Sequence, residues 1–147
     1  MKLVKQPLAL ASTFLWIGFL GAISFMEAWI KFRAPGVSLP IGLGIGRLVF
    51  SALNLMEWVF TIAIILNLIL SKWQWKNWIS LFIIIPIVLL IIQSIWLLPA
   101  LDARAELHIQ GEIVPESNLH FVYVGMEFIK LMSLLFWGIK LFKTRTE

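Results

Sequence analysis

Four long apolar stretches constrain this chain more than any other feature. They cover residues 8–32, 46–70, 78–98 and 119–142, and each is close to the roughly 20 residues that a helix needs to cross a bilayer. Only a helix satisfies its own backbone hydrogen bonds in hydrocarbon, and the chain is 61% hydrophobic and only 14% charged. We therefore expect an all-α integral membrane protein, with residues 1–147 forming a single domain that is a bundle of four transmembrane helices.

The connections between these stretches predict the rest of the architecture. Residues 33–45 hold two prolines and three glycines and are expected to form a loop and a glycine-rich approach to the second helix. Between the third and fourth helices, residues 101–110 have helical propensity, and Gly111 is suited to end a helix. We therefore expect a short interfacial helix in this connection.

Lysine and arginine divide unequally between the two sides that this topology defines. The side with the more basic residues is expected to be cytoplasmic, which places both termini in the cytoplasm and predicts the bacterial inner (cytoplasmic) membrane as the location. The two sets are Lys2, Lys5, Lys72, Lys76, Lys140, Lys143 and Arg145 on the side of the termini, and Lys31, Arg33, Arg47 and Arg104 on the other.

Polar residues inside the predicted helices recur at helical spacing and so share faces. The third helix offers only Gln93 and Ser94, and we expect it to act as a packing wall. The other helices carry polar stripes, namely Ser24, Glu27 and Lys31 on the first, Arg47, Ser51, Asn54, Glu57 and Thr61 on the second, and His120, Tyr123, Glu127 and Lys130 on the fourth.

Counting along the helices predicts the depth of these residues. Glu57 lies ten residues beyond Arg47, and Lys130 lies ten beyond His120, so each is about 15 Å further along its helix. Glu57 and Lys130 are thus expected at the same level. With Glu127 they would close the base of a polar cleft that opens to the outside, and Glu27, Arg47 and His120 would lie at its mouth. The candidate ligand-binding residues are Glu27, Arg47, Asn54, Glu57, Arg104, His120, Tyr123, Glu127 and Lys130.

Two interpretations of these charges stay open at this point. An ionisable residue inside a membrane costs roughly 3 kcal/mol and commonly marks a ligand, ion or proton site. The alternative is an architectural network, in which three acids and three bases neutralise one another. The first interpretation is favoured, because apolar residues would serve stability as well as a buried network does.

Several other kinds of chemistry have no support in the sequence. There is no cysteine, phosphate-binding glycine loop, Ser-His-Asp order or nucleic-acid motif. The spacing of His108 and His120 matches no compact zinc pattern, and no Glu-x-x-His pair is present, so no metal site is predicted. The cofactor remains unknown. The expected partners are the lipid bilayer, a small molecule or ion, and a second copy of the chain, with no nucleic acid.

Scattered segments along most of the chain carry a resemblance to a known family. They are FMEAWIKFRAP (25–35), GRLVF (46–50), LPALDARAE (98–106) and NLHFVY (118–123). In these segments the chain resembles the transmembrane-protein-205-like family of four-helix membrane proteins. The resemblance implies the architecture expected above and leaves the chemistry open.

A second resemblance concerns the predicted second helix alone. Its segment RLVFSALNLMEWVF is similar to the second helix of the membrane-associated eicosanoid and glutathione metabolism proteins, although residues 50–52 replace the Arg-Ala-His run of that family. The resemblance implies glutathione bound between the subunits of a trimer. Arg47, Asn54 and Glu57 would be the binding candidates, and Tyr123 a thiolate-stabilising hydroxyl.

The main functional expectation is a membrane-embedded protein that binds or transports a small polar or amphiphilic molecule, an ion or a proton in an outward-opening polar cleft. A membrane enzyme of the glutathione-transferase or haem or metal type is the first alternative. An accessory subunit of a membrane complex, whose charges are matched internally or by a partner chain, is the second.

Overall fold

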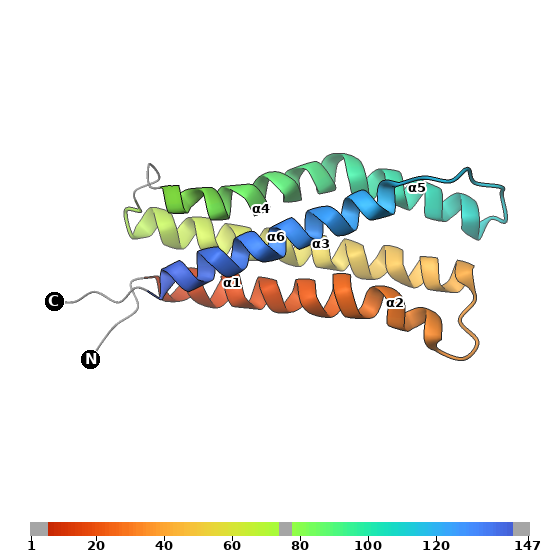
Figure 1. Ribbon diagram of the computed structural model, residues 1–147, viewed down its shortest axis with the longest axis horizontal. Coiled ribbons are helices and arrows are strands. Elements are labelled where there is room, and N and C mark those ends of the chain that lie inside the picture. Colours follow the sequence, from red (N-terminus) through yellow and green to blue (C-terminus); the bar gives the residue numbers. More distant parts are fainter. Residues whose placement is uncertain (1–5, 74–77, 143–147) are drawn as a thin grey trace.

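The computed structural model describes residues 6–73 and 78–142 and shows an all-helical bundle (Figure 1). No strand occurs in these residues. The helices that are long and apolar enough to cross a membrane are Pro7–Arg33, Leu39–Leu70, Trp78–Ile109 and Leu119–Leu141. The predicted all-α fold with four apolar spans is therefore confirmed.

The first span changes its helical form along its length. It consists of α1 (Pro7–Leu20), the π-helix η1 (Gly21–Glu27), α2 (Ala28–Ile30) and the 3₁₀ turn η2 (Lys31–Arg33). In η1 the hydrogen bonds reach five residues back, which widens the helix locally. The span ends where Ala34 adopts an extended backbone, as expected for a residue that precedes a proline.

The second span is one continuous helix, α3 (Leu39–Leu70), and it begins seven residues earlier than residue 46, where the sequence predicted its start. Pro40 lies in the first turn, where a missing N–H costs nothing because that group has no intrahelical acceptor. The glycine-rich approach is thus helical. Packing compensates for its low helix propensity, because Gly42 and Gly46 leave room for the side chains of η2.

Gly42 is the glycine with the least space around it. A Cβ atom built there would lie 2.1 Å from the ring of Phe32, whereas one built at Gly44 meets nothing within 4 Å. We expect Gly42→Ala to push the Phe32 ring aside and to lower the free energy of unfolding by about 1–2 kcal/mol. Gly44→Ala is the matched control and should raise it by about 0.5–1 kcal/mol through helix propensity. Unfolding of the two detergent-solubilised variants, followed by circular dichroism, tests this; equal stabilities would contradict it.

The third span is longer than predicted. It consists of η3 (Trp78–Ser80), α4 (Leu81–Ile92), the π-helix η4 (Gln93–Leu97) and α5 (Leu98–Ile109). The sequence ended this helix near residue 98 and placed a separate interfacial helix over residues 101–110. The helix is present as α5, but it follows η4 directly and belongs to the third span.

Proline explains why the sequence placed a break there. A proline inside a helix normally removes one hydrogen bond and clashes with the preceding turn, so Pro99 predicts an end. In the structure, the backbone N–H of Leu98 reaches the carbonyl of Gln93, five residues back. The wider π turn just before Pro99 accommodates the proline ring and the missing hydrogen bond, so the helix continues. Gly111, with φ of 81°, follows the end of α5 as predicted.

The fourth span, α6 (Leu119–Leu141), crosses the others and contacts both α1 and α4, while α5 packs on α3 (Figure 1). We call the end of the bundle that carries residues 34–38 and 110–118 the loop end. The opposite end, where α1 begins and α6 finishes, is called the terminal end. Antiparallel spans thus bring the start of α3, all of α5 and the start of α6 together at the loop end.

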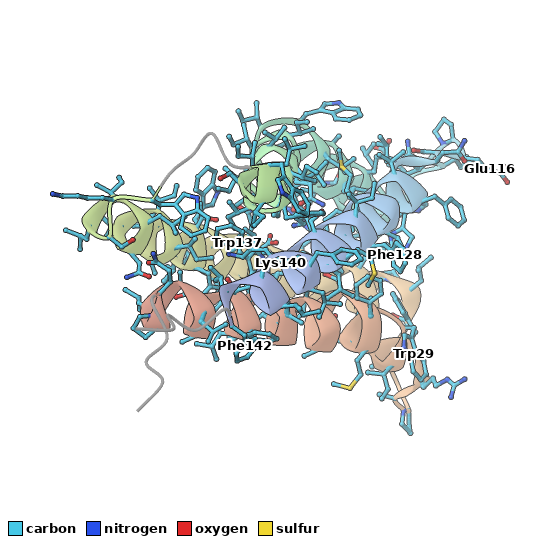
Figure 2. The ribbon with its side chains drawn as sticks, turned by 60° about the vertical axis from the view of Figure 1, so that its left-hand side comes forward. Trp29, Glu116, Phe128, Trp137, Lys140 and Phe142 are labelled. Carbon is cyan, nitrogen blue, oxygen red and sulfur yellow. The ribbon has the colours of Figure 1, made fainter. Side chains whose placement is uncertain are left out.

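Many large apolar side chains lie on the surface of the bundle. Trp29, Phe128 and Phe142 lie on outward faces and are each about half exposed (Figure 2). A membrane-embedded helix presents such side chains to lipid. The apolar core consists of Ala9, Trp16, Leu20, Leu53, Phe60, Ile64, Leu68, Ile83, Leu90, Leu134, Trp137 and Leu141.

The position of the termini relative to the membrane stays a prediction. The positive-inside argument counted seven basic residues on the terminal side, and five of them lie outside the described residues. These five are Lys2, Lys5, Lys76, Lys143 and Arg145.

Candidate functional site

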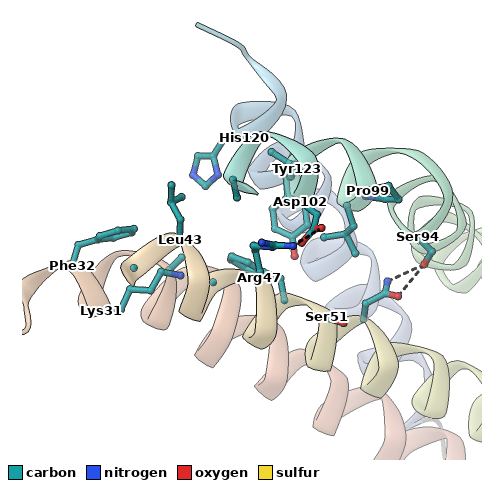
Figure 3. A pocket seen from close by; sticks show the side chains of 18 residues that line it. Lys31, Phe32, Leu43, Arg47, Ser51, Ser94, Pro99, Asp102, His120 and Tyr123 are labelled. Atoms are coloured by element: carbon teal, nitrogen blue, oxygen red, sulfur yellow. Dashed lines mark hydrogen bonds and ion pairs between the residues drawn. The ribbon is translucent and has the colours of Figure 1, made fainter. Parts of the chain in front are cut away.

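A cavity of about 560 Å³ opens at the loop end, and all four spans contribute to its wall (Figure 3). The first span supplies Lys31 and Phe32 from η2. The third span supplies Ser94 from η4 and several residues of α5. The helices α3 and α6 supply the residues that the sequence singled out here, namely Arg47, Asn54, His120 and Tyr123.

Arg47 joins α3 to α5 across this cavity (Figure 3). Its Nε and Nη2 donate to the two carboxylate oxygens of Asp102 at 2.6 and 3.0 Å, and its Nη1 donates to Glu106. The two acids lie four residues apart, so they share one face of α5. Asp102 and Glu106 were not predicted as partners of Arg47, because the sequence places them in the outer connection between the third and fourth helices. The bidentate geometry orients the guanidinium and offsets its charge.

Lys31 of η2 also lines the cavity and is also paired with a carboxylate. Its Nζ lies 3.2 Å from Glu27 Oε2 and 5.1 Å from the centroid of the Phe50 ring. Its side chain is only 8% exposed, so ring and carboxylate replace its hydration. Glu27, which the sequence placed at the mouth of the cleft, serves as the partner of Lys31 and is not among the residues that line the cavity.

Asn54 and Ser94 join α3 to the third span. Asn54 Nδ2 donates to Ser94 Oγ at 2.8 Å, and Trp58 Nε1 donates to the same oxygen at 3.1 Å. Ser94 in turn donates to the carbonyl of Leu90, one turn earlier. The prediction that the third helix is only a packing wall is therefore wrong. The π-helix η4 directs the two polar residues noted in the sequence toward other helices, Ser94 toward α3 and Gln93 toward α6.

A second polar cluster lies inside the bundle and consists of Glu57, Glu127 and Lys130, which we call the buried triad. Lys130 Nζ lies 2.7 Å from Glu127 Oε1 and also donates to Glu57 Oε1. None of the three residues is more than 2% exposed. The structure thus brings Glu57 and Lys130 together, as counting along the two helices predicts. Trp16 Nε1 completes the contacts of Glu57 by donating to Oε1 at 2.9 Å.

Glu127 accepts a hydrogen bond from a residue of each π-helix, η1 and η4. Ser24 in η1 donates to its Oε2 at 2.7 Å, and Gln93 in η4 donates to its Oε1 at 2.8 Å. π-helical turns are rare and often occur at functional sites. Here each one presents a polar side chain to the same carboxylate.

The buried triad does not line the cavity, contrary to the prediction that it forms the base of an open cleft. Tyr123 and Phe50 line the cavity, and their rings pack edge to face at 5.2 Å. Glu127 lies one turn beyond Tyr123 on α6, and Glu57 lies two turns beyond Phe50 on α3. The aromatic pair therefore lies between the cavity and the triad.

Two other predictions concern residues near the loop end. His120 lines the cavity and is exposed. Arg104 lies away from it and donates to the carbonyl of Pro115, so it supports the connection to α6 instead of the cavity. Within residues 6–73 and 78–142, no group of three or more His, Asp or Glu side chains is placed to hold a metal ion.

The fold and site define a membrane helical bundle with a cavity at its loop end and a buried charged cluster beyond it. No protein-family model, curated protein or solved structure matches the chain. Both family resemblances therefore remain predictions from the sequence.

Proposed function

We propose that the protein binds a small amphiphilic molecule in the cavity at the loop end. The observation that carries the proposal is the cavity itself, whose volume of about 560 Å³ falls in the range of small-molecule pockets. Its wall combines aromatic rings such as Phe32 and Phe50 with a few polar groups. This combination is typical of sites that bury an apolar body and orient it through hydrogen bonds.

The charges in the wall favour a ligand with a neutral polar group. Arg47 is already paired with two carboxylates and Lys31 with one, so neither needs a charged ligand to balance it. Ser51, Asn54 and His120 can still exchange hydrogen bonds with a hydroxyl or amide. A ligand with an apolar body and an uncharged hydrogen-bonding head fits this wall best.

The packing of the bundle beyond the cavity favours a binding protein over an open channel. Behind the buried triad, the bundle toward the terminal end is filled by apolar core residues such as Ile64, Leu68 and Leu141. The structure is therefore closed on that side. Transport would require a second arrangement of the helices, with the cavity open toward the terminal end.

The glutathione-type alternative fits less well. Arg47, Asn54 and Tyr123 do line the cavity, but the guanidinium of Arg47 is committed to Asp102 and Glu106. Glu57 lies beyond the aromatic pair and pairs with Lys130. A tripeptide with two carboxylates would have to displace the existing partners of Arg47.

The proposed setting is the bacterial inner membrane, with cytoplasmic termini and the cavity on the outer side. The bilayer is the first partner in this setting. A second copy of the chain is also proposed, because Gly18 in α1 and Gly21 in η1 have nothing within 4 Å of an added Cβ atom in a single subunit. Small residues of this kind allow two membrane helices to approach closely.

Photocrosslinking tests the binding proposal. The probes are a diazirine-bearing fatty acid and its neutral glycerol ester, added to protein in lipid nanodiscs. Ser51→Phe should fill the cavity and reduce labelling of its wall at least tenfold. Ala52→Phe is the matched control, because Ala52 is exposed on the same helix and does not line the cavity.

The two probes also distinguish the kind of head group. Stronger labelling of the wall by the glycerol ester supports a neutral ligand. Equal labelling of wild type and Ser51→Phe at the cavity residues, mapped by mass spectrometry, would contradict the proposal.

A further inference from the structure

The buried triad is unbalanced in charge. It contains two carboxyl groups, on Glu57 and Glu127, and one ammonium group, on Lys130. In the part of the chain that the structure describes, its salt bridges involve only these three residues. With all three ionised, the triad would carry one uncompensated negative charge in the interior of a membrane protein, which is costly.

The groups that face the two carboxyl groups, Glu57 and Glu127, confirm this imbalance. From α6 they are Lys130 and Glu127, together with the hydroxyl of Tyr123 one turn away. From the first span they are Trp16 and Ser24, and from η4 the amide of Gln93, all of them uncharged. No further cation among the described residues contacts either carboxyl group.

The hydrogen bonds distinguish the two carboxyl groups. Both oxygens of Glu127 accept a hydrogen bond, Oε2 from Ser24 and Oε1 from Gln93, which is the pattern of a carboxylate. Its Oε1 also lies 2.7 Å from Lys130 Nζ as an ion pair. Glu57 accepts both of its bonds, from Trp16 and Lys130, on Oε1. Its Oε2 receives no donor from the described residues. This is the pattern of a carboxylic acid, with Oε1 as the carbonyl oxygen and Oε2 carrying the proton.

Two residues near the triad, one in the chain and one by contact, each hold a buried polar atom that has no partner among the described residues. Thr61 lies one turn from Glu57, is 1% exposed, and its hydroxyl has no partner in the described structure. Gln93 Oε1 is equally buried and also unpartnered, although the Nε2 of the same amide contacts Glu127. Both atoms can accept a hydrogen bond, and buried polar groups are rarely left unsatisfied.

We propose that the buried triad is a proton-binding site, in which Glu57 carries one exchangeable proton on Oε2 while Glu127 and Lys130 form the ion pair. Protonation makes the triad neutral, which its complete burial requires. The proton comes from water in the cavity and returns to it. Tyr123 lines the cavity and lies one turn before Glu127 on α6, so it stands between that water and the triad. The site needs no ligand in the cavity and does not depend on the proposed binding function.

Infrared difference spectroscopy of the protein in nanodiscs, with isotope-labelled glutamate, detects this proton directly. The expected spectrum at neutral pH contains the carbonyl stretching band of one protonated carboxylic acid. Glu57→Gln should remove the band. Lys130→Met should double it, because both carboxyl groups must then be neutral. Glu27→Gln, which alters the half-buried carboxylate near the cavity, should leave it unchanged.

Two milder variants assign the proton to one residue. Trp16→Phe removes a hydrogen bond to Glu57 Oε1, so it should move the band to higher frequency. Ser24→Ala removes a hydrogen bond to Glu127 and should leave the band in place. These variants keep all charges and so remain informative if Lys130→Met fails to fold. A shift with Ser24→Ala alone, a full band in Glu57→Gln, or no band in wild type would overturn the proposal.

Discussion

Replacing Lys130 with alanine will lower the free energy of unfolding by about 3–5 kcal/mol, because it leaves two buried carboxyl groups without the cation that pairs with both of them. Lys130 is 0% exposed and bridges Glu57 on α3 to Glu127 on its own helix. Titration of the purified protein with sodium dodecyl sulfate, followed by circular dichroism, measures the loss.

The loss should shrink as the pH is lowered, because protonation of both carboxyl groups removes the uncompensated charge. The matched control is the triple variant Glu57→Gln, Glu127→Gln and Lys130→Met, which replaces the whole triad by neutral groups of similar size. We expect it to be about as stable as wild type, since exchanging a complete buried ion pair for neutral groups is often neutral or stabilising. If Lys130→Ala is no less stable than the triple variant, the triad does not form.

Trp16→Ala should also destabilise the protein by about 3–5 kcal/mol. The indole is 0% exposed and belongs to the apolar core, so its removal leaves a large void. It also removes the hydrogen bond to Glu57 Oε1. Both effects act at the contact between α1 and α3, and thermal unfolding followed by circular dichroism measures them together.

Trp29→Ala makes the same chemical change on an outward face, where the side chain is 50% exposed, and is the control for Trp16→Ala. Its effect should stay within about 0.5 kcal/mol, as is usual for surface positions. Equal losses in the two variants would show that Trp16 does not occupy the core position described above.

Periodicity predicted much of the candidate site, because polar residues on one face of a helix stay on that face in any packing. Arg47, Asn54, His120 and Tyr123 do meet around one cavity. Glu57 and Lys130 do lie at one level. These results follow from the rise and turn of a helix, which do not depend on its neighbours.

The partners of these residues were not predictable in the same way. Trp16 looks like any apolar core residue in the sequence, and only the crossing of α1 over α3 directs its N–H to Glu57. Asp102 and Glu106 were assigned to a separate interfacial helix outside the third span, because Pro99 indicated the end of that span. The π turn that lets the helix continue is a small local rearrangement with no clear signal in the residues themselves.

The sequence by itself determined that the chain forms four apolar helices with polar stripes, because backbone satisfaction in lipid and helical spacing are local requirements. Only the tertiary structure decided that the stripes divide into a cavity and a separate buried triad. The division depends on how the rings of Phe50 and Tyr123 meet across two helices. Contacts of this kind arise from packing between segments far apart in the chain, and no spacing within one helix specifies them.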